Sequence, residues 1–314
     1  TSMENQTTVT EFIFLGLSSD RQIQIFLFVV FFIIYLVTML GNIVMMVLIK
    51  VDFHLHTPMY FFLFHLSFVD ICYSSVTVPN MLMNFLVESK TISVRGCLSQ
   101  MFLFFLLAGT EVFLLSAMAY DRYAAICDPL HYVDAMNKKI WVQLMSGAWT
   151  TGFFYALINT VFALDLHFCG PNEIQHFSCE LPPLLRLSCR DILVNQVVLL
   201  SSVVVLGSSS FLFTLISYVY VITTILRMRS AEGRRKAFST CSSHLIVVGL
   251  LYLTAFLQYT KPRSISSAVL DEMFSIQYSI LTPMLNPIIY SLKNKEVKTA
   301  LRSISGKCFC LVSL

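Results

Sequence analysis

Apolar residues in this chain are gathered into seven long runs, and most charged residues lie in the short segments between them. Each run approaches or exceeds the roughly 20 residues that an α-helix needs to cross a bilayer. The short alternating segments of a membrane β-barrel are absent. The pattern predicts an all-α membrane protein, a seven-transmembrane helix bundle, with spans at 23–49, 58–87, 100–127, 140–164, 194–226, 239–259 and 274–292.

Composition supports this prediction. Of 314 residues, 56% are apolar and only 12% are charged, and the mean hydropathy is +0.74. A soluble domain carries about a quarter charged residues. The net charge of +3 averages two differently charged faces and says little about partners. Membrane lipid is an expected partner, and nucleic acid is not.

The distribution of basic residues predicts the orientation. With the N-terminus outside, 14 of the 21 Lys and Arg residues lie in inner loops and the tail, as the positive-inside rule requires. We therefore expect an extracellular N-terminus at 1–22, a membrane domain at 23–292 and a cytoplasmic tail at 293–314, beginning with a short amphipathic helix. The first 22 residues do not resemble a cleavable signal peptide. Asn5 lies in an N-x-S/T sequon on the outer side, so we expect it to be glycosylated.

The third span ends in a charged pair, Asp121 and Arg122, flanked by Tyr120 and Tyr123. An arginine at the edge of a bilayer is costly unless it is paired, snorkels or faces the protein interior. Two interpretations follow from the local chemistry. The pair either anchors the span at the interface or belongs to the functional interior of the bundle.

Two carboxylates lie well inside apolar sequence, Asp70 in the second span and Glu111 in the third. Intramembrane carboxylates are functional candidates. If they face each other, one should be protonated or a cation should lie between them. The alternative is that each is neutral and hydrogen-bonded to a nearby hydroxyl or amide. Glu111 and Arg122 are 11 residues apart, about three helical turns, and so share one face.

Other polar residues fall within the later spans: His244 and Tyr252 in the sixth, and Asn286 and Tyr290 in the seventh. Single residues of these types often serve only to hold helices together. Several at the inner half would instead form a switchable network, and Pro287 would supply a hinge.

No enzymatic motif is present: the chain lacks HExxH, GxSxG and a phosphate-binding glycine loop. The seventh span has no lysine to hold retinal. An ion path through Asp70 and Glu111 remains as a transporter or channel alternative, although the two halves show no obvious repeat.

Four cysteines fall on the outer side, one at the start of the third span and three in the long second outer loop, namely Cys97, Cys169, Cys179 and Cys189. In an oxidising compartment they imply two disulfides, with three possible pairings. We expect the crosslinked loop to cover the mouth of the bundle. His167 and His176 nearby allow a metal site as an alternative. Cys308 and Cys310 in the tail are either palmitoylated or free.

Several short motifs lie along the spans. They are Gly41-Asn42, Pro58-Met59-Tyr60-Phe61-Phe62-Leu63, Leu66-Ser67 with Asp70, Ser217-Tyr218, and the segments 118–127, 236–245 and 283–290. With these motifs the chain resembles the rhodopsin-like G-protein-coupled receptors, and among them closely the odorant receptors. The second outer loop resembles the class II branch. Ala124 and Lys293 depart from the family's usual Val and Arg.

The resemblance implies disulfides Cys97–Cys179 and Cys169–Cys189. It also implies a location in the plasma membrane, in the cilia of olfactory neurons, and coupling to a stimulatory olfactory-type G protein that raises cyclic AMP. The G-protein contact would involve Arg122, the inner loop around Pro129 and His131, and the inner ends of the fifth and sixth spans. We expect the switch and coupling residues to be Asp121, Arg122, Tyr123, Tyr218, His244, Asn286, Pro287 and Tyr290.

The resemblance further implies that a small odorant binds among the outer halves of the spans. The candidate contacts are Phe104, Phe105, Ala108, Gly109, Val112, Ser202, Val203, Leu206, Tyr252, Ala255, Phe256, Tyr259, Ile276 and Ser279. They are mostly apolar with scattered hydroxyls, as suits a small, mostly apolar ligand. The outer half of the third span has no carboxylate, so a biogenic amine is a poor candidate. Lys261 and Arg263 could attract an acid, but contact with lipid or water at the rim is the preferred interpretation. A receptor of this fold for a non-odorant metabolite is the alternative.

Overall fold

The computed structural model describes residues 9–87, 90–260, 268–294 and 296–302. Six long helices run through the molecule, α1 (Arg21–Val51), α2 (Pro58–Leu86), α3 (Val94–Cys127), α5 (Lys138–Ala163), α7 (Leu193–Arg227) and α8 (Ala231–Thr260). A seventh path is formed by α9 (Ala268–Ile276), the π-helical turn η3 (Gln277–Leu281) and α10 (Thr282–Lys293). Short helices lie in the connections, η1 (Phe53–Leu55), α4 (Tyr132–Ala135) and α6 (Leu181–Leu187).

The seven predicted spans all fall on these helices, which confirms the seven-helix bundle. In the described part of the chain, five helices are long and apolar enough to cross a membrane by length and composition alone: α1, α2, α3, α7 and α8. α5 has 26 residues but is interrupted by more polar positions. The seventh crossing is divided into three pieces, so no single helix in it reaches the required length.

Capping side chains explain where several helices begin. The Asp20 carboxylate accepts hydrogen bonds from the backbone N–H groups of Gln22 and Ile23, at 2.8 and 3.3 Å. The Ser93 hydroxyl accepts one from Gly96 N–H at 3.1 Å. Such caps satisfy backbone donors that have no partner within the helix. The third helix therefore starts at Val94, before the apolar run itself begins.

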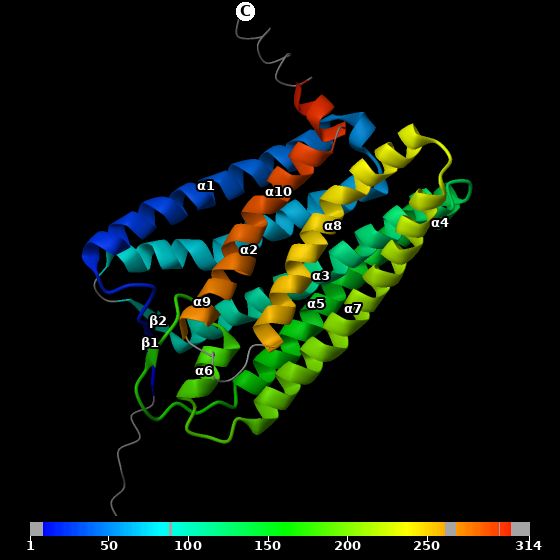
Figure 1. Ribbon diagram of the computed structural model, residues 1–314. Coiled ribbons are helices and arrows are strands. Elements are labelled where there is room, and N and C mark those ends of the chain that lie inside the picture. The colour runs from blue at the N-terminus through cyan, green and yellow to red at the C-terminus, as the bar shows by residue number, and fades with distance from the viewer. Residues whose placement is uncertain (1–8, 88–89, 261–267, 295, 303–314) are drawn as a thin grey trace, which may run out of the picture.

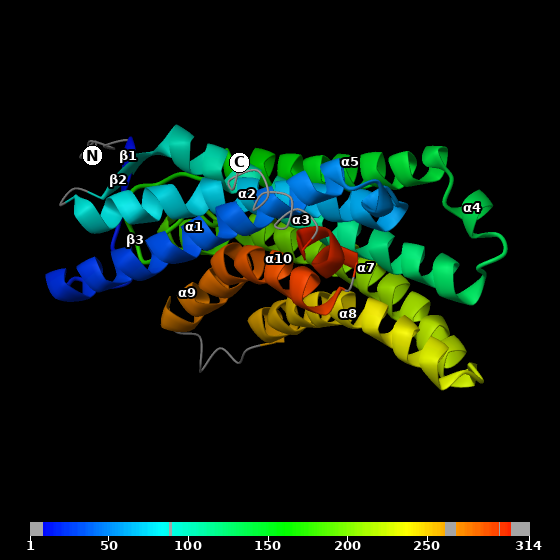
Figure 2. The same cartoon turned by 90° about the horizontal axis from the view of Figure 1, so that it is seen from above.

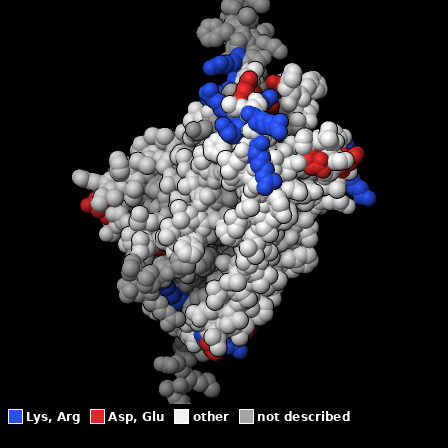
Figure 3. Space-filling model, turned by 45° about the vertical axis from the view of Figure 1, so that its right-hand side comes forward, with Lys and Arg blue, Asp and Glu red and all other residues white. Residues whose placement is uncertain are grey.

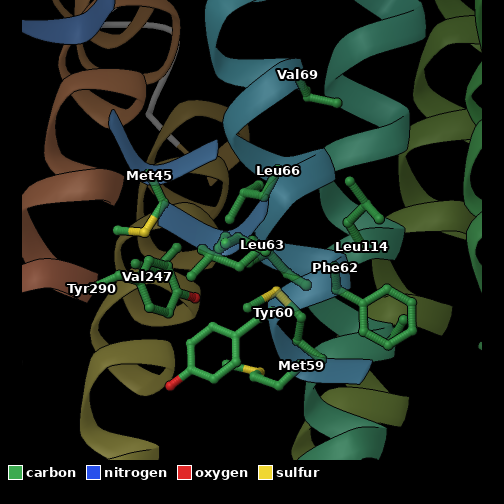
Figure 4. Packing of buried hydrophobic residues seen from close by; sticks show 14 of the residues in the cluster. Met45, Met59, Tyr60, Phe62, Leu63, Leu66, Val69, Leu114, Val247 and Tyr290 are labelled. Carbon is green, nitrogen blue, oxygen red and sulfur yellow. The ribbon is translucent and has the colours of Figure 1, made fainter. Parts of the chain in front are cut away.

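Helix α3 is the centre of the bundle. It contacts α2, α5, α7 and α8, whereas α1 packs against α2 and α10. Figures 1 and 2 show the helices lying side by side along the long direction of the molecule. The largest buried cluster fills the inner half between them, and Figure 4 shows Met45, Val247 and Tyr290 in this packing.

The two ends of the bundle differ. β1 (Glu11–Phe14) lies at one end and the C-terminal end of α10 at the other (Figure 1). On the face shown in Figure 3, Lys and Arg gather at the end nearer α10, beyond a broad surface almost free of charge. This arrangement agrees with an outer N-terminus and a basic inner side.

A small sheet at the outer end is the main feature that the hydrophobic pattern does not predict. β1 lies between β2 (Thr91–Ser93), to which it is antiparallel, and β3 (Glu173–Ile174), to which it is parallel. Phe12 and Phe14 point into a cluster with Cys179 and Leu184. The N-terminal segment therefore joins the first and second outer loops into one structure.

Both disulfides implied by the resemblance are present. Cys97, at the outer end of α3, is bonded to Cys179, with their Cα atoms 5.3 Å apart. Cys169 is bonded to Cys189 within the second outer loop, with a Cα–Cα distance of 5.8 Å. Since these sulfurs are in disulfides, they are not metal thiolates. The described residues contain no group of three or more potential metal-binding side chains of His, Cys, Asp or Glu.

The predicted amphipathic helix after the seventh span begins as expected. Residues 296–302 are helical, and Val297 and Ala300 are buried against the bundle. The Tyr60 hydroxyl donates a 2.6 Å hydrogen bond to Glu296 and so ties this segment to α2. Cys308, Cys310 and the sequon at Asn5 lie outside the described residues.

Candidate functional site

A cavity of about 240 Å³ lies in the outer half of the bundle, lined by α2, α3, α5, α7, α8, η3 and the second outer loop. Pockets for drug-sized ligands measure about 300–1,000 Å³, so this cavity suits a smaller molecule. Most of its lining is aromatic or aliphatic. Aromatic side chains enclose one part of it, since the Phe104 ring contacts Tyr73, Phe105 and Tyr278 at centroid distances of 5.2–6.0 Å.

Ten of the fourteen residues expected to contact an odorant line this cavity. They are Phe104, Phe105, Ala108, Gly109, Val112, Ser202, Val203, Leu206, Tyr252 and Ala255. They come from α3, α7 and α8, which the bundle brings together at its outer half. The resemblance to the odorant receptors supplied these ten positions, and the structure brings them to one cavity.

Three of the other four expected contacts, Phe256, Ile276 and Ser279, do not line the cavity. Phe256 is 63% exposed on the outside of α8, and Ile276 packs with another cluster around Phe31 and Phe85. Ser279 is buried and donates to the Ser275 carbonyl at 2.6 Å. The π-helical turn η3 alters the direction of the side chains in the seventh span relative to a regular α-helix. A regular helical period therefore does not predict which of these residues face the cavity. The side chain of Tyr259 lies outside the described residues.

Sequence reasoning missed several lining residues. The loop supplies Glu180, Leu181 and Pro182, and other helices supply Tyr73, Phe113, Tyr155, Leu199, Gly207, Leu251, Thr254, Gln258 and Tyr278. One signal was available: Glu180 directly follows Cys179, whose disulfide holds it near the outer end of α3. The remaining positions depend on how the helices rotate against one another.

The roof of the cavity is a buried polar network around Glu180. The Tyr278 hydroxyl donates to Glu180 Oε2 at 2.5 Å, and the Ser178 hydroxyl donates to Oε1 at 3.2 Å. His176 Nε2 lies 3.1 Å from the Ser275 hydroxyl. The side chain of Gln100 on α3 accepts from Cys179 N–H at 2.9 Å. The loop is thus held to α3 and η3 by hydrogen bonds as well as by a disulfide.

The intramembrane carboxylates Asp70 and Glu111 are close enough to interact electrostatically, and both are buried. Asn286 on α10 donates its amide to both Asp70 oxygens, at 3.0 and 3.2 Å. Glu111 also lines the cavity, and its Oε1 is buried with no hydrogen-bond partner in the described residues. Two carboxylates, one with an unused oxygen, are ligands that a small hard cation prefers. The residues therefore fit a cation.

At the inner end of α3, Arg122 is held by its neighbour. Its guanidinium donates from Nε to Asp121 Oδ2 at 3.0 Å, and a second nitrogen binds the same oxygen. The Tyr132 hydroxyl of α4 donates to Asp121 Oδ1 at 2.7 Å. Burial and the adjacent Asp121 carboxylate raise the pKa of Tyr132, so this hydroxyl keeps its proton. The acid therefore joins α3 to the second inner loop.

Four other expected switch residues, Tyr123, Tyr218, His244 and Tyr290, lie near this pair, and among the described residues they do not form a single chain of hydrogen bonds. The Tyr218 hydroxyl on α7 is 2.5 Å from His244 Nδ1 on α8. Tyr123 makes an edge-on ring contact with Tyr220, with centroids 5.8 Å apart. Tyr290 is fully buried, and its hydroxyl has no hydrogen-bond partner in the described residues. Arg122 is within electrostatic range of Tyr218 and Tyr290.

Helix α10 is closely packed at its proline. Pro287 lies within α10, and a Cβ placed on Gly41 of α1 would lie 3.1 Å from its Cγ. Next to Gly41, the Asn42 amide donates to the Pro283 carbonyl at 3.0 Å. This contact explains the small and polar residues at this point of the first span.

The same fold is found in the solved structure of squid rhodopsin, with a TM-score of 0.70. The two chains are 16% identical, and the match covers 91% of this chain and 86% of squid rhodopsin. The protein therefore has the fold of the rhodopsin-like G-protein-coupled receptors.

Sequence comparison is more specific. The family model described as olfactory receptor matches residues 31–307. Mouse (Mus musculus) olfactory receptor 5G9 is 51% identical, over 95% of this chain and 95% of its own length. Human (Homo sapiens) olfactory receptor 8S1 is 52% identical, over 95% of this chain and 82% of its own length. The chain belongs to the olfactory receptor family: it is a multi-pass plasma-membrane receptor and not an enzyme.

Proposed function

We propose that this receptor binds small, volatile, mostly apolar molecules in the outer cavity and activates a stimulatory, olfactory-type G protein, which raises cyclic AMP. The observation that carries the proposal is the arrangement of α3. This one helix lines the cavity through Phe104, Ala108 and Glu111, and it carries the Asp121–Arg122 pair near its inner end. A change at the cavity has a direct route to the inner surface along it.

The inner surface offers suitable groups for a protein partner. In the loop after α3, Leu130 is 90% exposed and Val133 is 78% exposed, and His131 lies between them. Exposed apolar side chains at the basic inner end support docking of a G protein there. Ligand binding would favour a state in which Arg122 leaves Asp121 and α8 separates from α7 at Tyr218 and His244. The differential affinity of the ligand for the two states drives the change.

The proposal is tested by R122A in cells that report cyclic AMP, using an agonist found by screening a panel of volatiles. We expect the maximal response to fall at least tenfold while surface expression is retained. The reason is that the variant lacks the Arg122 guanidinium, which the active state would free from Asp121. R190A is the matched control, since Arg190 pairs with Asp165 on the exposed outer loop at 3.2 Å. An unchanged response in R122A would overturn the proposed mechanism.

We also propose that a monovalent cation binds between Asp70 and Glu111. Two buried carboxylates placed together repel each other when both are ionised, and a cation removes that cost. The unused Oε1 of Glu111 supports the proposal, because a buried polar atom without a partner is costly. A cation here stabilises the receptor, so replacing sodium by choline should lower its melting temperature.

A further inference from the structure

The outer end of the cavity presents hydrogen-bond acceptors. They are the carboxylate of Glu180 and the amide oxygen of Gln258, which is buried and has no hydrogen-bond partner in the described residues. Resting on the function proposed above, we propose that the ligand is a small apolar molecule whose head group donates hydrogen bonds, a protonated amine in preference to a neutral alcohol. We place this head at Glu180 and Gln258, and the apolar body between α3 and α7.

The donors on the cavity wall are largely used within the protein. The Ser202 hydroxyl donates to the Leu199 carbonyl at 2.9 Å, and the Thr254 hydroxyl donates to the Leu250 carbonyl at 2.7 Å. Two tyrosines of the lining are engaged as well: Tyr252 donates to Ser210 at 3.0 Å, as Tyr278 does to Glu180. A ligand that can only accept hydrogen bonds would compete with these bonds, whereas a ligand that donates can bind the Glu180 carboxylate and the Gln258 amide oxygen.

Charge balance at Glu180 favours a cationic head over a neutral one. The carboxylate is buried, and its hydrogen bonds come from two neutral hydroxyls, Ser178 and Tyr278. The nearest ionisable side chain paired with it is His176, at 3.9 Å. Among the described residues no Lys or Arg pairs with Glu180, and Arg186 on the same loop pairs with Asp271 instead. A buried carboxylate without a charged partner is costly, and a bound ammonium group would offset that cost.

This inference changes the expectation drawn from the third span. The absence of a carboxylate from the outer half of that span argued against an amine. The structure brings a carboxylate to the same space from the loop, because the Cys97–Cys179 disulfide holds the residue after Cys179 over the cavity. Glu180 lies more than fifty residues beyond the third span in the sequence, so its place in the cavity could not be predicted from the sequence of that span.

The ligand class is tested with a matched panel in a cyclic AMP reporter cell. Each apolar skeleton, linear, branched, cyclic or aromatic, carries in turn an amine, a hydroxyl, an aldehyde or a carboxylate; the linear set is hexylamine, hexanol, hexanal and hexanoic acid. We expect amines to be the most potent agonists and alcohols the next. Activation by aldehydes or acids alone would overturn the inference and leave the proposed function standing. If the receptor reached the cell surface but responded to no compound of the panel, both the ligand class and the proposed function would be contradicted.

The residue assignment is tested with E180Q, which keeps an acceptor for Ser178 and Tyr278 but removes the charge. We expect at least a tenfold loss of potency for the amine and less than a threefold loss for the alcohol of the same skeleton. E180D should restore part of the amine response. E173Q is the matched control, because Glu173 lies in β3 of the same loop and is exposed. Equal potency of the amine on E180Q and the unsubstituted receptor, at equal surface expression, would overturn the assignment.

Discussion

At the residue scale, the buried polar side chains divide into groups that are paired and groups that are not. Asn286 and Asp70 satisfy each other across α10 and α2, at 3.0 and 3.2 Å. Glu111 has an unused oxygen in the same neighbourhood. Both carboxylates were evident as candidates from their apolar surroundings in the sequence. The hydrogen bond from Asn286 to Asp70 joins two helices whose residues are more than two hundred positions apart. No local sequence pattern predicts it.

The cation proposed between these carboxylates gives a prediction at this scale. In purified receptor, thermal unfolding in sodium chloride should occur at a higher temperature than in choline chloride, because an ion that binds only the folded state stabilises it. We expect E111Q to abolish this difference, since it removes one charged ligand. E232Q, at an exposed position near the inner end of α8, should retain it. A sodium effect of equal size in E111Q would exclude Glu111 as a ligand.

At the element scale, α3 and α5 approach each other closely through two glycines. A Cβ on Gly152 would lie 2.3 Å from Thr110 Oγ1 and 2.6 Å from the Leu106 carbonyl oxygen. A Cβ on Gly109 would lie 3.0 Å from the Cα of Gly152. Small residues at helix interfaces in membranes allow this contact of backbones. Since Gly109 also lines the cavity, the spacing of α3 and α5 contributes to the shape of the ligand site.

G152A should therefore destabilise the receptor by about 1–3 kcal/mol, the usual cost of overpacking a well-packed interior. The measurement is the thermal midpoint of the purified receptor, together with its surface expression. G147A is the matched control on the same helix, because nothing lies within 4 Å of the added Cβ. It should be neutral or slightly stabilising, since alanine favours helix over glycine by about 1 kcal/mol. Equal behaviour of the two variants would contradict the close contact.

The seventh path shows where prediction at this scale stops. One apolar run, 274–292, predicts one helix, but the structure has α9, the turn η3 and α10. The Thr282 hydroxyl donates to the Gln277 carbonyl at 3.0 Å across this turn. As a result Tyr278 lines the cavity, whereas Ser279 is buried away from it. Hydrophobicity is the same for either geometry, so the run itself does not reveal the turn.

At the scale of the whole molecule, the outer end is a single assembly of three chain segments. β1 from the N-terminal segment pairs with β2 before α3 and with β3 in the second outer loop. The Cys97–Cys179 disulfide joins the same loop to α3, with both sulfurs in buried residues. Cys169 and Cys189 lie in an exposed part of the loop. The first disulfide, and not the second, positions the cavity roof.

The two disulfides should therefore differ in their effect on signalling. We expect C97S/C179S to lose the agonist response and to lower the free energy of unfolding by about 2–5 kcal/mol, as is usual for a native disulfide. C169S/C189S should keep at least a third of the maximal response, because Glu180 remains anchored to α3. Agonist-evoked cyclic AMP, normalised to surface expression, is the measurement. If removal of the exposed disulfide proved as damaging as removal of the buried one, the anchoring role would be wrong.

The sequence alone determined that the chain crosses the membrane seven times and which side is basic, because transfer of apolar runs to lipid and the placement of basic residues are local properties. The cavity-facing residues of α3, α7 and α8 came from the resemblance to the odorant receptors. Only the tertiary structure decided that Glu180 forms the cavity roof, that Tyr278 replaces Ser279 on its wall, and that the N-terminal strand closes the outer end. Each of these depends on contacts between distant segments, where a disulfide, a change of helical turn or a paired strand edge determines the direction of a side chain.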